Sequence, residues 1–368
     1  MKYNWQQADW PFFKYDTSEI QDVLFNFAEK TGHVSGILKS LPDSTQTEAL
    51  LDLMVSETIK TSEIEGEYLS RSDVMSSIRH NLGLDITPTQ VLDHRAKGAA
   101  ALMVDVRESF KEILTEEKLF AWHQMLMFGR RHMEIGAWRR HEEPMQIISG
   151  PVGKWKVHFE APPSERVPSE MTNFIVWFNN TAPGAKIEIK NPVVRAAVAH
   201  LYFESIHPFE DGNGRIGRAI SEKALSQGLG RPTLLSLSET IEANKKDYYE
   251  ALKTAQRSNK ITRWINYFAN TALQAQARTE EKIDFILMKT KFFDRFKHQL
   301  NDRQLKVVLR ILGEGPQEFE GGMSTKKYIV ITKTSKATAT RDLQYLSEIG
   351  ALKQTGGGHS TKYDIHFD

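Results

Sequence analysis

The chain has 368 residues, enough for two or three domains at about 100–200 residues each. It is 40% hydrophobic and 26% charged, which is ordinary for a globular protein, and its net charge of +1 gives no overall field that favours nucleic acid or membrane. The absence of cysteine excludes disulfides and thiol catalysis. We find no bilayer-spanning apolar stretch and no signal-peptide pattern, so we expect a cytoplasmic protein without membrane contact.

The N-terminal part combines an aromatic segment with two helices. Residues 1–17 carry aromatic side chains among polar ones, including Trp5, Trp10, Phe12, Phe13 and Tyr15. Side chains of this size bury large areas, so we expect an ordered arm packed on the body of the protein. Apolar spacing predicts helices over residues 18–41 and from Asp43 to Glu65, the second ending at a left-handed Gly66.

The middle of the chain is predicted to be helical around one hairpin. Capping patterns at Ser70–Asp73, Thr87 and Thr115 predict helices after Ser70, over 87–110 and over 115–128. Residues 145–148 and 154–159 alternate as two strands around a Gly-Pro turn, and helical spacing resumes over 167–179. Further helices are predicted over the following ranges: 192–206, 215–225, 248–257 and 262–288.

The C-terminal part has a different order of elements. After a boundary near 289–301, three helices are predicted over 302–312, 325–331 and 336–350. A hairpin with a glycine turn follows, formed by residues 351–355 and 360–365. Three helices and a hairpin are the outline of a winged helix-turn-helix. The predicted fold is therefore mainly α, with a β-hairpin inserted in a helical core and a winged helix at the C-terminal end.

The loop between the two central helices, residues 207–218, concentrates functional groups in the sequence HPFEDGNGRIGR. His207 can accept a proton from an attacking hydroxyl, and Asp211 is a hard ligand suited to Mg²⁺ that bridges phosphates. Gly212 and Gly214 let the backbone turn tightly and approach a ligand.

Positive groups in the same loop favour an anion. Backbone N–H groups around Asn213 lie at the start of a helix, where they bind anions. Arg215 and Arg218, three residues apart, can face the same anion, and guanidinium suits phosphate oxygens. Together these groups indicate phosphoryl or nucleotidyl transfer. The alternative is a helix–loop–helix turn in which Asn and Gly set the geometry, Asp caps and His packs.

Residues 207–218 match, position for position, the signature of Fic domain proteins, and the resemblance extends over roughly residues 45–270. It implies a Mg²⁺-dependent enzyme that moves AMP from ATP to a hydroxyl side chain of a protein and releases pyrophosphate. By this resemblance, His207 would be the base and Asp211 would hold Mg²⁺. Gly212, Asn213, Gly214 and Arg215 would cradle the phosphates, and Arg218 would reach the γ-phosphate.

Other segments resemble further parts of Fic proteins. Residues 61–66, TSEIEG, are similar to an inhibitory helix whose glutamate, here Glu65, pairs with the second arginine, here Arg218. The hairpin over 145–159 is similar to a flap that binds the target protein as an added strand. Residues 247–252 are similar to the segment with a nucleotide-pocket tyrosine, here Tyr248 or Tyr249. From the residues alone, each segment has an alternative. Glu65 could be a solvated acid at a helix end, the hairpin could only cover the core, and Tyr248 and Tyr249 could be core residues.

Three domains are predicted. Residues 1–44 form an N-terminal arm and helix, residues 45–288 a Fic core, and residues 289–368 a winged helix. The inhibitory helix is the first part of the core, about residues 45–66. Polar and basic residues at the third C-terminal helix and wing suit DNA: Ser335, Lys336, Thr338, Thr340, Arg341, Lys353, His359 and Lys362. A protein-binding module is the alternative there, and we expect a homodimer. Three functions stay open. The first is AMP transfer under a built-in brake, and the second is removal of AMP or transfer of another phosphate-linked group. The third is a transcription regulator that binds DNA through the winged helix and senses nucleotide through an inactive Fic pocket.

Overall fold

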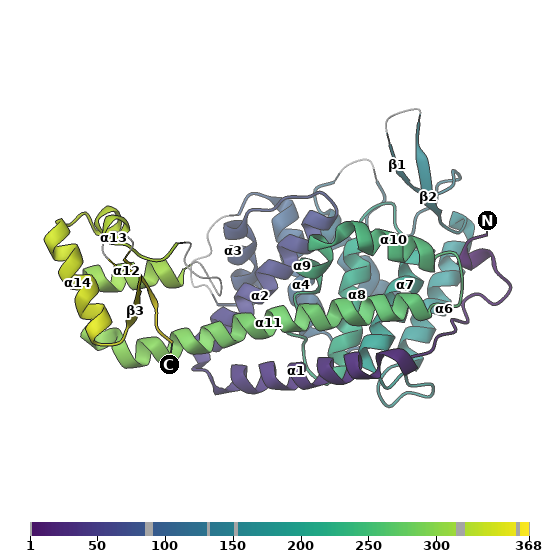
Figure 1. Cartoon of the computed structure of the whole chain (residues 1–368). Coiled ribbons are helices and arrows are strands. Elements are labelled where there is room, and N and C mark those ends of the chain that lie inside the picture. Colours follow the sequence, from purple (N-terminus) through teal and green to yellow (C-terminus); the bar gives the residue numbers. More distant parts are fainter. Residues whose placement is uncertain are drawn as a thin grey trace. The chain divides into compact units, whose positions relative to one another are not determined.

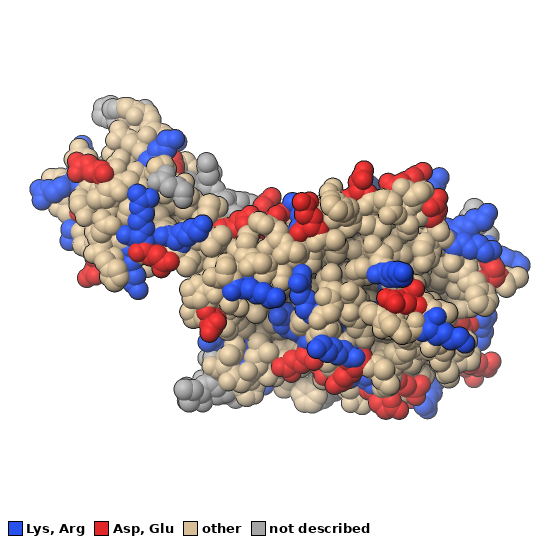
Figure 2. All heavy atoms as spheres, turned by 90° about the horizontal axis from the view of Figure 1, so that it is seen from below, with Lys and Arg blue, Asp and Glu red and all other residues tan. Residues whose placement is uncertain are grey.

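The structure is a computed structural model that describes residues 2–84, 91–130, 133–150, 154–313, 321–357 and 361–367. It divides into two compact units, one of residues 1–32 and 50–277 and the other of residues 33–49 and 278–368. Helices dominate both units (Figure 1). Among the described residues no helix is long and apolar enough to cross a bilayer. Figure 2 shows positive and negative side chains interspersed over the face in view, in keeping with the net charge of +1.

The elements follow one another in this order: α1 (Gln21–Ser40), α2 (Asp43–Ile64), α3 (Arg71–Asn81), α4 (His94–Glu108), α5 (Glu116–Met127), β1 (Gln146–Ser149), β2 (Lys156–Glu160), α6 (Val167–Asn180), α7 (Pro192–Ile206), α8 (Asn213–Leu229), α9 (Leu237–Ala243), α10 (Lys245–Ala255), α11 (Thr262–Phe296), α12 (Asp302–Leu312), α13 (Thr325–Thr332), α14 (Lys336–Glu348), β3 (Leu352–Thr355) and β4 (Lys362–Ile365). Short 3-10 turns stand at Asn4–Gln6, Ser18–Ile20, Ser164–Arg166 and Lys297–Gln299.

Helix α7 is the centre of the first unit. Every one of its residues after Pro192 is buried, so it has no solvent-facing side. Such a helix is stable only when other elements surround it, because its apolar side chains must be buried on every face. Buried polar groups fix it in place: Arg195 donates to the carbonyl of Phe178 at 2.8 Å, and Trp264 donates to the carbonyl of Ala197 at 2.7 Å.

The N-terminal arm packs on this unit, as the aromatic residues predicted. Asn4 donates to Ser205 of α7 at 2.8 Å, and the indole of Trp5 donates to the carbonyl of Glu160 at the end of β2, also at 2.8 Å. Trp10 donates to the Glu170 carboxylate at 2.8 Å. The arm therefore joins the base of the hairpin to the central helix.

Most predicted elements are present with bounds shifted by a few residues, as in α8 and α10, and α4, α9 and α11 differ more. Helix α4 begins at His94, where the Asp93 side chain accepts from the Arg95 N–H at 2.9 Å, so the predicted start at residue 87 is wrong. The cap predicted at Thr87 lies outside the described residues. Helix α9 was not anticipated, and α11 continues to Phe296 rather than stopping at 288.

The second unit contains α12, α13, α14 and the antiparallel pair β3–β4, in the predicted order. A bridge between Met323 and Tyr363 ties the start of α13 to the hairpin. Asp342 is turned inward, where it accepts from the Tyr328 hydroxyl at 2.9 Å and from Arg303 at 3.1 Å. That this unit is a DNA-binding winged helix stays a prediction, and His359 lies outside the described residues.

Candidate active site

The loop of residues 207–214 connects the ends of two buried helices. His207 ends α7 in a left-handed conformation, with φ 52° and ψ 61°. This is uncommon for a residue with a side chain, so the surroundings must hold it. The buried Arg139 does so by donating to the carbonyl of His207 at 2.8 Å, to Pro162 at 2.5 Å and to Ser164 at 2.9 Å. Arg139 therefore braces the loop.

Asn213 gives the loop its shape. Its amide oxygen accepts from the Phe209 N–H at 2.9 Å, and its amide nitrogen donates to the Phe209 carbonyl at 2.8 Å. Phe209 in turn stacks on the buried ring of His123, with ring centroids 4.2 Å apart. Both ends of the Asn213 side chain thus bond to the backbone of Phe209, which fixes the loop and leaves the main-chain N–H of Asn213 at the start of α8.

Helix α8 begins directly after this turn and offers an anion site. Gly212, at φ 83°, precedes it, and no described side chain caps the helix. The first N–H groups of a helix have no partners within the helix, and they carry the positive end of its dipole. A Cβ on Gly214 would lie 2.2 Å from Oε1 of Glu65, so the carboxylate of Glu65 lies directly against this glycine.

Glu65 binds Arg218 at the same place. Its Oε1 accepts from Nη2 of Arg218 at 2.7 Å. Arg218 also donates to the hydroxyl and the carbonyl of Thr61, at 2.7 and 2.9 Å, so the end of α2 satisfies most of its guanidinium. Arg218 is only 4% exposed. The anion that occupies the start of α8 in this structure is therefore the protein's own carboxylate.

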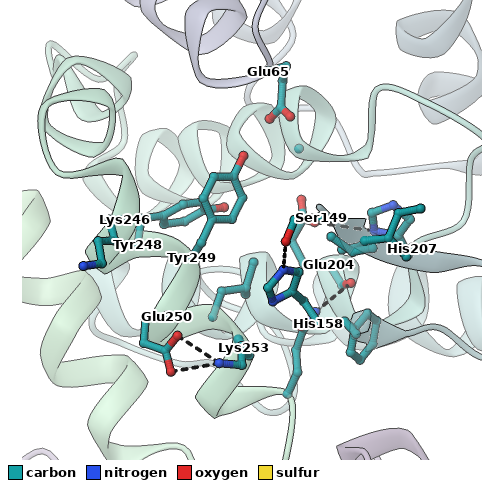
Figure 3. A pocket seen from close by; sticks show the side chains of 16 residues that line it. Glu65, Ser149, His158, Glu204, His207, Lys246, Tyr248, Tyr249, Glu250 and Lys253 are labelled. Atoms are coloured by element: carbon teal, nitrogen blue, oxygen red, sulfur yellow. Dashed lines mark hydrogen bonds and ion pairs between the residues drawn. The ribbon is translucent and has the colours of Figure 1, made fainter. Parts of the chain in front are cut away.

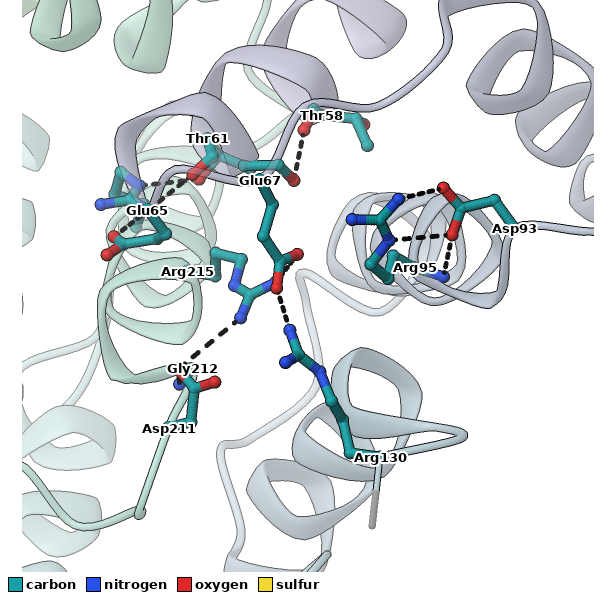
Figure 4. A network of polar contacts seen from close by, with 12 residues as sticks. Thr58, Thr61, Glu65, Glu67, Asp93, Arg95, Arg130, Asp211, Gly212 and Arg215 are labelled. Carbon is teal, nitrogen blue, oxygen red and sulfur yellow. Dashed lines mark hydrogen bonds and ion pairs between the residues drawn. The ribbon is translucent and has the colours of Figure 1, made fainter.

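A second acid, Glu67, binds the other arginine of the loop (Figure 4). Its Oε2 accepts from Nη1 of Arg215 at 2.7 Å, and its Oε1 accepts from Arg130. Arg215 is 3% exposed, and its Nη2 lies 3.8 Å from Asp211. Sequence reasoning missed Glu67, because it follows the helix break at Gly66 and belongs to no periodic pattern. The only signal was a third glutamate two residues beyond Glu65.

His207 is held neutral. Burial, together with the positive charge of Arg139, lowers its pKa to about 4. Its Nδ1 is buried, and Oε2 of Glu204 is 3.7 Å away. A neutral imidazole has a lone pair available, which is what a base needs in order to take a proton from a hydroxyl.

A pocket of about 590 Å³ opens beside His207 (Figure 3). Its lining comes from the end of α2, the hairpin, the start of α8 and α10, and includes Glu65, Ile148, His207, Gly214 and Tyr249. The hairpin pairs with a register shift between Ile147 and Ile148, and the hydroxyl of Ser149 lies 2.6 Å from His158 Nε2. The pocket is thus bounded by the predicted base, the predicted brake and the predicted flap.

The two predicted tyrosines occupy different positions. Tyr248 is 2% exposed, and its hydroxyl bonds to Nε2 of His200 at 2.7 Å, so it is held from the core side. Tyr249 is 39% exposed along the pocket. Of the pair, Tyr249 is the ring that a nucleotide base could stack on. Lys246 and Lys253, on the same helix, also line the pocket and were not anticipated.

Asp211 has the properties of a single Mg²⁺ ligand. Its side chain is 51% exposed, and Oδ1 accepts from the Gly212 N–H at 2.6 Å. Within the described residues, no three His, Asp or Glu side chains cluster to hold a metal by themselves. Mg²⁺ is commonly held by one or two carboxylates, phosphate oxygens and water, so one exposed carboxylate beside an anion site fits this ion.

The comparisons with known proteins identify the helical core. Residues 113–225 match the model of the Fic/DOC family. This part of the chain is a Fic domain. Residues 3–84, which include Glu65, match a family described as a domain of unknown function, DUF4172.

Solved structures extend the likeness of this chain to its fold. A Fic family protein from Desulfovibrio desulfuricans superposes over 95% of this chain and 97% of its own, at 22% identity and a TM-score of 0.54. Fic-1 from C. elegans covers 75% of this chain and 74% of its own, at 19% identity and a TM-score of 0.54. These similarities establish the fold, including the mainly helical architecture.

Two curated relatives have names that state an activity. The Protein adenylyltransferase Fic of Nematostella vectensis is 30% identical over 74% of this chain and 57% of its own length. A Probable protein adenylyltransferase of Aquifex aeolicus is 31% identical over 40% of this chain and 38% of its own. The chain thus spans about half the length of these relatives, or less. The roles of individual residues in this chain remain predictions.

Proposed function

We propose that this protein transfers AMP from ATP to a hydroxyl side chain of a protein, and that Glu65 restrains the reaction. One observation carries the proposal. The carboxylate of Glu65 lies on Gly214 and Arg218, at the start of α8, in the same pocket as His207. An anion site next to a neutral base is what nucleotidyl transfer requires, and the names of the curated relatives agree with that chemistry.

The proposed step uses His207 as the base. The hydroxyl oxygen of the target attacks the α-phosphorus, and its proton moves to the ring of His207. The bond from the α-phosphorus to the oxygen that bridges to the β-phosphate breaks, and pyrophosphate leaves with that oxygen. The backbone N–H groups of Asn213 and Gly214, with Arg215, would neutralise charge on the phosphates. Asp211 would hold Mg²⁺, which would supply charge neutralisation on the phosphates when bound.

The proposed brake acts through competition for the same groups. Glu65 occupies the surface of Gly214 and the Nη2 of Arg218, which a γ-phosphate would need. It also adds a negative charge that repels the phosphates. ATP would then bind weakly, or with its α-phosphorus out of line with the target hydroxyl.

The target would bind along the hairpin. β1 and β2 form a two-stranded sheet among the described residues, and Ile147, Ile148 and Ser149 line the pocket. An extended target segment added to this sheet would place its hydroxyl beside His207.

The test is incorporation of label from ATP into protein. Replacing Glu65 by Gly should raise labelling from α-labelled ATP, and adding His207→Ala should abolish it. γ-labelled ATP should leave no label, because that phosphate departs in pyrophosphate. If the Glu65→Gly protein gains neither labelling nor ATP affinity, the brake is refuted; if label persists without His207, the base is refuted.

Removal of AMP is the second candidate. Glu65 is 28% exposed on its side chain and faces the pocket beside His207, where a carboxylate could hold an attacking water. Incubating AMP-modified protein with the unaltered chain and with Glu65→Gly separates the two. Release of AMP that depends on Glu65 would favour removal over transfer.

A further inference from the structure

A buried carboxyl group, that of Glu204, lies beside the ring of His207 at the end of α7. Among the described residues, Oε1 of Glu204 and Nδ1 of His207 have no hydrogen-bond partner. Oε2 of Glu204 is 3.7 Å from that Nδ1, and Glu204 is only 3% exposed. Buried polar atoms are almost always bonded, so an unbonded ring nitrogen beside a buried carboxyl group calls for an explanation.

The neighbouring helix leaves room for this carboxyl group. A Cβ on Gly217 of α8 would lie 2.4 Å from Oε1 of Glu204 and 3.4 Å from the ring of His200. Any larger residue at 217 would displace Glu204. Glu204 stands three positions before His207, in the last turn of α7, and the left-handed backbone of His207 leaves Nδ1 3.7 Å from Oε2 of Glu204.

Burial favours the neutral form of both groups. Burial and the charge of Glu65 raise the pKa of Glu204 to about 8, while burial lowers the pKa of His207 to about 4. The charged and titratable groups that bear on the two come from α2, α7, α8, α10 and the segments beside the loop: Glu65, His200, Arg218, Tyr248, Tyr249, Arg139 and Asp211. A neutral carboxyl group keeps a carbonyl oxygen that accepts a hydrogen bond.

The two ring nitrogens of His207 have different surroundings. Nδ1 is buried toward Glu204, whereas His207 lines the pocket and 13% of its side chain is exposed. The nitrogen that meets a target hydroxyl is therefore Nε2. It can accept a proton only if the ring hydrogen is on Nδ1, and a partner for the Nδ1–H selects that tautomer.

We propose that Glu204 is the positioning residue of His207: its carboxyl oxygen accepts the Nδ1–H, which keeps Nε2 free as the base and steadies the imidazolium that forms. The inference rests on the proposed AMP transfer for its catalytic consequence. The gap of 3.7 Å exceeds a hydrogen bond by about 0.8 Å, and such contacts often tighten only when substrate is bound. Glu204 takes no proton in this step; the proton from the target ends on Nε2.

The experiment compares Glu204→Gln with Glu204→Leu in the Glu65→Gly protein. A Gln side chain keeps a neutral acceptor of the same shape, whereas Leu keeps volume and removes it. We expect Leu to lower kcat by about 10²-fold, near the lower end of what a positioned base contributes, with KM for ATP changed less than about twofold. Gln should restore kcat to within about threefold of the parent. Glu170→Gln, a buried acid bonded to Trp10, is the matched control and should leave kcat unchanged.

A second readout does not depend on activity. ¹⁵N NMR of the histidine rings, with His207 assigned by its loss in His207→Ala, reports which nitrogen carries the hydrogen. We expect Nδ1–H in the parent and in Glu204→Gln, and a shift toward Nε2–H in Glu204→Leu. An unchanged tautomer in Glu204→Leu, or equal loss of kcat in Leu and Gln, overturns the proposal. If the parent transfers no AMP, the proposed function fails while the tautomer still decides the role of Glu204.

Discussion

Neutralising Glu67 should raise ATP affinity even though Glu65 is intact. Glu67 binds Arg215 at 2.7 Å, and their side chains are 14% and 3% exposed, so water screens the pair weakly. A phosphate that needs Arg215 must first replace this carboxylate. The substitution Glu67→Gln removes the charge and keeps an oxygen of the same shape for Arg130.

The size of the effect follows from the contact. A hydrogen bond to a charged group contributes about 1.5–3 kcal/mol, and about 1.4 kcal/mol corresponds to a factor of ten. Removing the Glu67 carboxylate, which competes with phosphate for Arg215, should therefore tighten ATP binding roughly tenfold to a hundredfold. The increase in ATP affinity should be near the lower end of this range if the Gln oxygen still accepts a hydrogen bond from Arg215.

The assay is titration calorimetry with ATP and Mg²⁺, in a His207→Ala background that prevents turnover. Glu65→Gln and the double variant Glu65→Gln/Glu67→Gln are measured in parallel, and the double variant should bind more tightly than either single one. Glu63→Gln is the matched control, because Glu63 pairs with Lys60 at 2.5 Å rather than with the loop. An ATP affinity in Glu67→Gln within twofold of the control would refute the reasoning.

Three further outcomes are expected. Gly214→Ala should abolish labelling even in the Glu65→Gly protein, because a Cβ there occupies the anion site; persistent labelling would contradict that geometry. Glu204 has a pKa of about 8 in the folded protein against about 4.3 unfolded, so its contribution to stability is full below about pH 4.3 and is lost as pH rises through about 8. Other buried acids and histidines also titrate on unfolding, so the decline should appear in the difference in unfolding free energy between the parent and Glu204→Gln, measured by chemical denaturation between pH 5 and 8.5. If the C-terminal unit binds DNA, Lys336→Ala with Arg341→Ala should weaken the shift of genomic fragments at physiological salt, whereas no binding above the non-specific level would remove that prediction.

Local signals predicted the elements that depend on local chemistry. The bounds of α7 and α12 agree with their apolar spacing and caps. The start of α4 was wrong because two capping patterns compete, and Asp93 is the one that bonds to the helix. The end of α11 was wrong because Phe292 and Phe296, beyond the expected boundary, belong to the core of the second unit.

The same distinction between local and long-range contacts explains which site residues could be predicted from the sequence. The loop residues follow one another in sequence, so their chemistry could be recognised together. Glu67 and Arg130 come from separate segments. Only folding brings Glu67 to Arg215, and Arg130 to Glu67. Glu204 had one visible signal, a carboxylate in a helix that is otherwise nearly all apolar, but its partner became apparent only from the burial of both groups.

The left-handed backbone of His207 has a consequence for how this site is maintained. A residue with a side chain in that conformation costs about 1–2 kcal/mol relative to glycine. His207→Gly should therefore fold as well as the parent or better, while it loses the base. If His207 is the proposed base, its side chain is kept at a cost in stability. A screen for stability alone would then favour glycine at residue 207 and discard the base.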